Sequence, residues 1–567
     1  MKATKTYTGL PTNKLIIGYK DIFEKKPDFG RIEILKGISK ENIIAELAGL
    51  NYRLKGQKSK FVDTSFVTQQ DELFYFCGKN KELYMKYASL IDTKTCGREA
   101  FTFSRQACLY GIEEIIQSDL PIIEGFKMSD QLSSWEALLI YILCINDEVT
   151  KIEENDPDTP INFETLNPKL LPISELMLIS DPFYIVYRGW NLMIYLEKIE
   201  ETKQSLIDYF TATYQCTYER FIFEILRMWM ANRHQHEHLN FYYQLPDDES
   251  FKYLFDRLSN KYNNAETHKL LNIRKHPFFK MDEKTYMLTD LSNLLDKAYY
   301  QFINDFFFDK LKGEKKSNGK VFSMQDYKAI IGQFFQEYVR DKLEYSFKNS
   351  RNYIVKMFEQ LEVRLSSGRL IECGDVYIRN ENKVIIGEVK ASSLYDNERY
   401  GGNVDAMYKN NRDTFFKNFG VDQLVNNIIN IDRNIEDIDK DFTNRKKIRI
   451  WPVIILNEKA FQTPLMAQIF SSRFKELMGN YNDKRKHVYP LTLLHLSDLE
   501  NMECELNKSP HLIWDLLSNN FGSPTKFIPP FYNTLHRNDI RADYKRFKEK
   551  VKILFDKFSK GNTASPI

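Results

Sequence analysis

Two strand-like runs joined by a short polar turn occupy residues 371–392. The first run reads IECGDVYIRN (371–380), the turn reads ENK (381–383), and the second run reads VIIGEVKAS (384–392). Both runs are rich in β-branched and apolar residues, which favour strands, and the polar turn favours a hairpin. The sequence therefore predicts two adjacent antiparallel strands.

Asp375, Glu388 and Lys390 are the charged residues of this hairpin that suggest a site. Asp375 follows a glycine in the first run, and Glu388 interrupts the apolar second run. Antiparallel pairing would bring these two carboxyl groups near each other. Because side chains alternate along a strand, Glu388 and Lys390 share one face and Val389 points to the opposite face.

Two acids and a lysine on one sheet suit phosphodiester hydrolysis. Carboxylates bind hard divalent cations through oxygen, and such a cation polarises phosphate and lowers the pKa of a bound water. A nearby lysine orients that water or stabilises charge that builds up on phosphorus. Glu372 and Glu362 are further acids that could approach, since a register shift of one residue exchanges the two faces. The alternative is a surface hairpin that carries a cross-strand salt bridge.

The segments around the hairpin predict a complete α/β core. Residues 330–347 predict an amphipathic helix with apolar residues at helical spacing, namely Ile331, Phe334, Phe335, Tyr338 and Val339. A first strand is expected within 351–365, a second helix at 421–430 and a last strand at 448–458. The order helix, three strands, helix and strand is typical of an α/β domain.

The acidic residues follow a known pattern. Asp375 is followed, after twelve intervening residues, by the string E-V-K at 388–390. This arrangement resembles the signature of the PD-(D/E)XK nuclease superfamily, with Gly374 in place of the usual proline. The resemblance covers residues 330–458. It implies a restriction-endonuclease-like domain, in which a mixed central sheet is flanked by helices.

The resemblance also implies roles for individual residues. Family members carry a glutamate on the helix before the strands and a glutamine on the helix after them, which match Glu337 and Gln423. The implied catalytic residues are Asp375, Glu388, Lys390 and Gln423. The implied metal-binding residues are Glu337, Asp375, Glu388 and Val389. Mg²⁺ is the expected cofactor, with Mn²⁺ as an alternative.

Chain length and changes in composition along the chain predict a multi-domain protein. A chain of 567 residues exceeds the roughly 250–300 residues at which single cores stop growing. The charged break KGEKKSNGK (312–320) separates a mainly α-helical N-terminal half from the α/β segment, and the Asp- and Pro-rich run at 151–162 is a second linker. We expect α-rich regions at 1–150 and 163–311, a nuclease-like domain at 321–500, and a helical C-terminal extension at 501–567.

The second α-rich region carries three local signals. A short hairpin is expected with its turn at Asp282-Glu283, followed by a helix that begins at Thr289-Asp290. The run RHQHEH places histidines at every second position, namely His234, His236 and His238. On a strand they would share one face and suit zinc, whereas on a helix this spacing does not converge and histidine simply suits the C-terminus.

Charge gives no global sign of a polyanionic partner, because 80 basic residues nearly balance 78 acidic ones. Local basic clusters lie at 312–320, 445–447, 484–486 and 542–560, and the segment 392–419 adds Lys409, Arg412 and Lys417. Several such clusters around one core would suit a phosphate backbone. A single cluster is typical of a solvated surface, and the apolar stripe of 542–560 favours docking on the protein body.

The expected location is the cytoplasm. The seven cysteines form no CxxC pair and no even disulfide framework, which fits a reducing compartment. The N-terminal residues lack the apolar core of a signal peptide. No apolar run reaches the roughly 20 residues of a membrane span, so no membrane partner is expected.

Two functional hypotheses follow. The first is a Mg²⁺-dependent endonuclease that hydrolyses DNA, with RNA as an alternative substrate, in bacterial defence against phage or foreign DNA. In that case the helical half would recognise substrate, sense a trigger, form a homo-oligomer or bind a partner defence protein. The second is a non-catalytic nucleic-acid-binding or scaffold protein that retains a nuclease-like fold.

Overall fold

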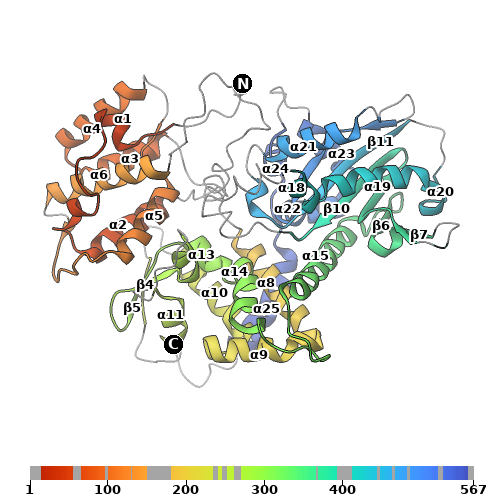
Figure 1. The fold of residues 1–567 in the computed structure, drawn as a ribbon, viewed down its shortest axis with the longest axis horizontal. Coiled ribbons are helices and arrows are strands. Elements are labelled where there is room, and N and C mark those ends of the chain that lie inside the picture. The colour runs from red at the N-terminus through yellow and green to blue at the C-terminus, as the bar shows by residue number, and fades with distance from the viewer. Residues whose placement is uncertain are drawn as a thin grey trace. The chain divides into compact units, whose positions relative to one another are not determined.

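The computed structural model (Figure 1) describes most of the chain. The described residues are 15–54, 66–95, 100–128, 131–149, 181–233, 241–245, 252–260, 270–364, 368, 370–392, 412–442, 447–462, 466–479, 481, 486–521 and 528–559. Contacts divide them into two units. The sheet unit comprises Met324–Arg546. The helical unit comprises the described parts of Asn13–Pro157, Leu176–Ser323 and Phe547–Ile567.

The change of unit at Ser323–Met324 lies shortly after the expected break at 312–320. The finer divisions expected near residues 150 and 500 stay predictions. Residues 151–162, expected to be a linker, lie outside the described residues.

The helical unit confirms the prediction of a mainly α-helical N-terminal half. Its helices include α1 (Tyr19–Phe23), α2 (Lys40–Arg53), α3 (Phe66–Phe76), α4 (Lys81–Thr95), α5 (Arg105–Gln117), α6 (Leu132–Val149), α8 (Pro182–Lys198), α9 (Glu200–Tyr214), α10 (Tyr218–Arg233), α11 (Lys252–Leu258), α12 (Leu271–Lys275), α13 (Leu291–Asp296) and α14 (Tyr300–Phe306). A short η1 (Glu33–Leu35) and a π-helical turn η4 (Phe307–Leu311) complete this set.

Short strands accompany these helices. A parallel pair joins β1 (Leu15–Ile16) to β2 (Ala100–Phe101). A three-stranded antiparallel sheet has the order β3-β5-β4, with bounds Tyr242–Gln244, Thr285–Leu288 and Phe278–Lys280. The β4–β5 hairpin turns at Asp282-Glu283, as expected. The Asp282 carboxylate stabilises this turn by accepting hydrogen bonds from the backbone N–H groups of Lys284 and Thr285, both at 2.8 Å.

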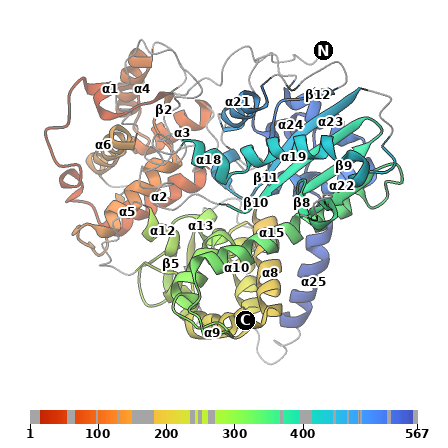
Figure 2. The ribbon, with the colours of Figure 1, turned by 45° about the vertical axis from the view of Figure 1, so that its right-hand side comes forward.

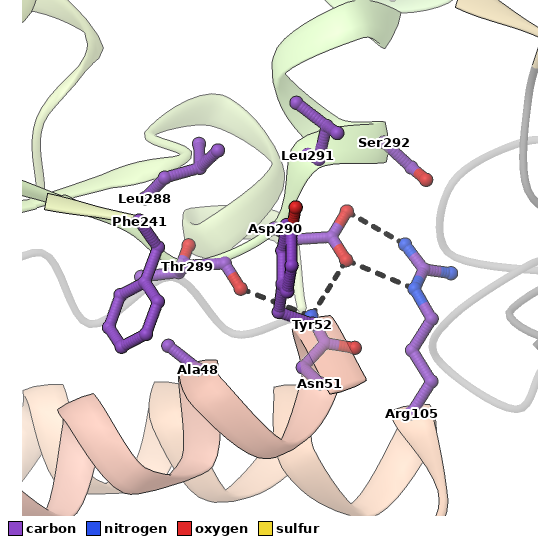
Figure 3. Close-up of a pocket in the computed structure, with 10 residues that line it drawn as sticks. All are labelled: Ala48, Asn51, Tyr52, Arg105, Phe241, Leu288, Thr289, Asp290, Leu291 and Ser292. Atoms are coloured by element: carbon purple, nitrogen blue, oxygen red, sulfur yellow. Dashed lines mark hydrogen bonds and ion pairs between the residues drawn. The ribbon is translucent and has the colours of Figure 1, made fainter. Parts of the chain in front are cut away.

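A buried ion pair ties α2 and α5 to the start of α13 (Figure 3). Asp290 is the N-cap of α13, as the sequence predicted, and accepts from the backbone N–H of Asn293 at 2.8 Å. The same carboxylate accepts from Arg105 of α5 at 2.8 and 3.0 Å and from Asn51 of α2 at 2.9 Å. Burial opposes ionisation, but these donors, Arg105 foremost, lower the pKa of Asp290 below its ordinary value.

A small pocket lies beside this ion pair (Figure 3), lined by Ala48, Asn51, Tyr52, Arg105, Phe241, Leu288, Thr289, Asp290, Leu291 and Ser292. The charged groups that reach it are already paired with each other. We therefore interpret the cluster as a structural clamp.

The sheet unit is built on a six-stranded mixed sheet of order β12-β11-β10-β9-β6, with β13 also paired to β11. The bounds are β6 (Ile354–Met357), β9 (Val376–Asn380), β10 (Lys383–Lys390), β11 (Ile448–Leu456), β12 (Lys486–Val488) and β13 (Thr492–His495). Strands β6, β9 and β10 are antiparallel neighbours, whereas β10, β11, β12 and β13 pair in parallel.

Helices flank this sheet, as predicted. They are α15 (Met324–Phe347), α18 (Arg412–Asn418), α19 (Val421–Arg433), α20 (Ile435–Ile438), α21 (Met466–Met478), α22 (Leu496–Lys508), α23 (Leu512–Phe521) and α24 (Phe531–Arg537). Two 3-10 turns, η5 and η6, span Phe358–Leu361 and Lys459–Gln462. The order α15, β6, β9, β10, α19, β11 matches the expected order of helix, three strands, helix and strand.

The expected first strand and the run 371–380 are each broken in two. The run 371–380 forms β8 (Leu370–Glu372) and β9, and β8 pairs with β7 (Glu362–Arg364) in a separate small sheet. The reason lies at Gly374, whose φ of +142° is accessible to glycine but not to other L-residues without strain. Proline, with φ near −65°, cannot adopt this backbone, which explains why the usual proline is absent.

The two faces of the sheet are covered by different helices. Helix α19 lies across β10 and β11 (Figures 1 and 2) and packs onto Val384, Ile386 and Ile454 in a buried core. On the other face Trp451 packs against Trp514 of α23, with ring centroids 5.0 Å apart. Helix α15 buries all five apolar residues predicted for its inner face.

The last described helix, α25 (Lys545–Ser559), docks on the helical unit from Phe547 onward, as its apolar stripe predicted. Phe547 contacts Phe183 with ring centroids 4.9 Å apart, and Leu554 is buried. Among the described residues, none of the helices combines the length and the hydropathy needed to cross a membrane.

The Asp290 clamp makes a stability prediction. We expect Asp290→Ala to lower the free energy of unfolding of the helical unit by about 3–5 kcal/mol, because it removes the carboxylate that faces the buried Arg105 guanidinium. The control is Asp28→Ala, which removes an exposed ion pair with Lys25 and should cost less than about 1 kcal/mol. Equilibrium denaturation in urea measures both, and equal losses would contradict the clamp.

Candidate functional site

The candidate site forms where the ladder between β9 and β10 ends. The last register pair is Val376 with Gly387, followed by a hydrogen bond from the Asp375 N–H to the Gly387 carbonyl at 3.2 Å. Beyond this point the chain turns away at Gly374. The N–H of Val389 therefore lacks a partner strand on this side, and it donates instead to the Asp375 carboxylate, Oδ2, at 2.7 Å.

Glu388 and Lys390 share one face of β10, as their spacing predicted, and form an ion pair. The Lys390 Nζ lies 2.7 Å from Glu388 Oε1. Glu388 is fully buried, whereas the Lys390 side chain keeps 22 % of its surface exposed. Val389 points to the other face with a buried side chain, so only its main-chain carbonyl could serve as a metal ligand.

Helix α19 supplies two amide side chains to this pair. The Lys390 Nζ donates to Gln423 Oε1 at 2.7 Å. One helical turn later, the Asn427 Nδ2 donates to Glu388 Oε2 at 2.6 Å. Residues four apart on a helix lie on the same face, so one stripe of α19 contacts both charged groups.

Gly420 allows α19 to approach so closely. It is the residue before α19 and has a φ of +84°. A Cβ atom built at this position would lie 2.8 Å from Glu388 Cγ and 2.9 Å from Lys390 Cε. A side chain at position 420 would therefore displace the ion pair as well as strain the backbone.

A third carboxyl group, that of Glu372, interacts with Asp375. Burial and the neighbouring Asp375 raise the pKa of Glu372. Burial, together with the negative charge of Glu388, raises the pKa of Asp375 to about 7. Burial also raises the pKa of Glu388, although the Lys390 ammonium opposes this. Asp375 and Glu388 are buried and Glu372 is exposed, and the mutual repulsion of these acids favours their protonated forms more than the one lysine opposes it.

The remaining predicted residues are less closely associated with Asp375, Glu388 and Lys390. Glu337 is exposed on α15, and within the described part of the chain no hydrogen bond or ion pair joins it to Asp375 or Glu388. Glu362 is exposed, and it is the register partner of Glu372. Lys417 is exposed on α18.

Several other predicted groups cannot be placed. His234, His236, His238, Lys409 and the side chain of Arg412 lie outside the described residues. The same holds for residues 445–446 and 484–485 of two basic clusters.

The buried acids fit a divalent cation in one respect. Glu388 Oε1 is buried and accepts no well-directed hydrogen bond, although the Lys390 ammonium is close. An oxygen in this state, next to a second carboxylate, is a suitable ligand for a hard cation. However, no three His, Cys, Asp or Glu side chains among the described residues already surround one point.

Sequence reasoning missed Asn427 and Gly420, and it named Glu372 only as an acid that could approach the site. Asn427 lies four residues after Gln423, a spacing that could have identified it once α19 was placed on the site. Glu372 was considered but not selected, because the break at Gly374 that turns it toward Asp375 is not visible in the strand pattern. Gly420 has no sequence signal of its own, since only the approach of α19 to β10 requires it.

The close approach at Gly420 is testable through stability. We expect Gly420→Ala to lower the free energy of unfolding of the sheet unit by about 2 kcal/mol or more, through left-handed backbone strain and overlap with Glu388 and Lys390. Gly332→Ala is the matched control, because a Cβ at that position in α15 meets nothing within 4 Å. It should stabilise the helix by about 0.5–1 kcal/mol. Similar values for both variants would contradict the close approach.

The raised pKa of Asp375 predicts a pH-dependent effect. The folded-state pKa of about 7 lies above the ordinary value of 3.8, so the fold favours the protonated acid and loses stability as pH rises between these values. We expect Asp375→Asn to raise the free energy of unfolding by about 1–3 kcal/mol at pH 8 in the presence of a chelator. The gain should shrink toward pH 4. A gain that is independent of pH, measured by denaturation at several pH values, would contradict this assignment.

Comparisons of the chain with protein-family models, with curated proteins and with solved structures found no match. The geometry of Asp375, Glu388, Lys390 and Gln423 is therefore the basis for assigning chemistry to the site.

Proposed function

We propose that the sheet unit is a Mg²⁺-dependent endonuclease of the PD-(D/E)XK kind that hydrolyses phosphodiester bonds of DNA. One observation carries the proposal. The partly exposed Lys390 ammonium is held at 2.7 Å by both Glu388 and Gln423, and the buried Asp375 is fixed beside them by the N–H of Val389. A surface salt bridge needs neither the burial of both acids nor the converging amides.

Each side chain has a distinct task in this proposal. Asp375 and Glu388 would hold Mg²⁺, which when bound polarises a phosphate and lowers the pKa of a coordinated water. Lys390 is placed to orient a water or to stabilise negative charge that develops on the phosphate. Gln423 positions the Lys390 ammonium, and Asn427 positions the Glu388 carboxylate.

The biological role in the proposal comes from the family resemblance. The resemblance to restriction-like nucleases supports cytoplasmic defence against phage or foreign DNA. The helical unit would then recognise substrate, respond to a trigger or bind a partner defence protein. Fold alone does not determine these roles.

A non-catalytic scaffold is the second candidate, and a specific observation favours it. Glu337 is exposed, and no set of three metal-binding side chains among the described residues surrounds one point. In that case Asp375, Glu388 and Lys390 would only stabilise the sheet edge.

Plasmid cleavage in the presence of Mg²⁺ or Mn²⁺ separates the two candidates. We expect wild type to nick or linearise the plasmid, and Asp375→Asn, Glu388→Gln and Lys390→Ala each to reduce the rate by at least about 100-fold. Lys348→Ala, at an exposed position of the same unit, is the control and should cleave like wild type.

Thermal unfolding supplies a readout that does not require activity. Mg²⁺ should raise the melting temperature of wild type but not of Asp375→Asn, because a ligand that binds only the folded state stabilises it. If Asp375→Asn and Lys390→Ala cleave like wild type, the catalytic assignment is wrong. If wild type neither cleaves nor responds to Mg²⁺, the scaffold is favoured.

A further inference from the structure

A row of basic side chains crosses three neighbouring strands of the sheet unit. Lys383 of β10 is the register partner of Arg449 of β11, and Arg449 is the register partner of His487 of β12. Register partners on adjacent strands point to the same face and lie about 4.8 Å apart. The exposed Lys447 comes directly before β11. These four residues are here called the cationic row.

The cationic row is separate from the candidate site. Strand β10 runs from Lys383 to Lys390, so about 23 Å separates the two ends at roughly 3.3 Å per residue. Lys383 and Glu388 also lie an odd number of residues apart on β10, so they point to opposite faces. The row therefore plays no part in holding the acids of the candidate site.

In the described part of the chain, the lysines and the arginine of the row have no acidic partner. Within the described residues, no ion pair joins Lys383, Lys447 or Arg449 to a carboxylate, whereas Lys486 on the other face pairs with Asp432. Burial and the positive charges of Lys447 and Arg449 lower the pKa of His487. Like charges in direct cross-strand positions destabilise a sheet, so this arrangement favours an anionic ligand.

Aromatic rings hold the row in place. The His487 ring packs edge-on against Tyr489 at 4.4 Å, and Tyr489 stacks on Trp451 at 4.4 Å. The Lys383 Nζ lies over the Trp514 ring at 5.7 Å from its centroid. Cations that are already ordered by neighbouring rings lose little entropy when they bind a ligand.

Strand pairing also brings together basic residues that are far apart in sequence. Lys447 directly precedes β11 and Lys486 begins β12, and the two strands pair in parallel from Ile448 with Lys486 onward. A polyanion on the face of the row would meet Lys383 of β10, Lys447 and Arg449 at β11, and the His487 imidazole of β12.

We propose that the cationic row binds the phosphate backbone of duplex DNA at a second place, away from the bond that is cleaved. This inference rests on the proposed function for the identity of its ligand. The row lies at the far end of β10 and on the opposite face of the sheet from the acids, so it would contact the backbone outside the site of cleavage. The row would hold the flank of a duplex and carry no sequence information, because phosphate contacts position the duplex and base contacts specify it.

The test measures binding without cleavage. We titrate two full-length proteins, wild type and the triple variant Lys383→Gln/Lys447→Gln/Arg449→Gln, against a fluorescein-labelled duplex of about 30 base pairs in a chelator, at several salt concentrations. The control triple variant is Lys348→Gln/Lys440→Gln/Lys475→Gln, three exposed lysines of the same unit. Thermal unfolding checks that both triple variants fold, and an RNA duplex of the same sequence forms a second arm.

We expect the row variant to bind at least about tenfold more weakly and to lose about 2–3 from the slope of log K against log salt concentration, since each phosphate contact contributes about 0.9. The control variant should retain the wild-type slope. The inference is overturned if the row variant binds with the affinity and slope of wild type, or if the control variant loses as much affinity as the row variant. It is also overturned if wild type does not bind the duplex. Preference for the RNA duplex would also overturn it as stated. Failure of cleavage leaves this binding result intact, so the two proposals fail separately.

Discussion

The N–H of Val389 is the point on which the candidate site depends. Strand β10 pairs with β11 along its whole length, but β9 covers it only as far as Gly387. A buried N–H without a partner is costly, and the Asp375 carboxylate satisfies it at 2.7 Å. The interrupted ladder therefore orients the Asp375 carboxylate. Glu388 and Lys390 face α19 next to it. The interruption also requires the positive φ angle of Gly374.

This arrangement lowers the stability of the sheet unit. Two buried acids, Asp375 and Glu388, and the exposed Glu372 lie near a single lysine, and the pKa values of all three acids are raised. Strain and unfavourable charge of this kind gather at functional sites, where the surrounding fold maintains them. The core under α19 maintains them in this chain, since Leu424 and Ile428 anchor the helix that carries Gln423 and Asn427. The Asp290–Arg105 pair of the helical unit shows the contrast, because there each buried charge meets its opposite.

Much of the fold was predictable because it depends on local patterns. The β9–β10 hairpin, the shared face of Glu388 and Lys390, and the buried face of α15 all follow from periodicity. Gln423 came from the resemblance to a family, and the structure places it on Lys390. Glu337 came from the same resemblance but is exposed on α15, because a helix pattern identifies the apolar face and does not say which polar residue borders a site.

The sequence by itself determined the fold class, the element order and the shared face of Glu388 and Lys390 on β10. These features depend on propensity and spacing within short segments. Only the tertiary structure decided that Asn427 holds Glu388, that Gly420 must lack a side chain, and that Lys383, Arg449 and His487 form one row. Each of these depends on the register or approach of segments that are distant in the chain. Such contacts are set by the packing of the whole unit, and no local pattern encodes them.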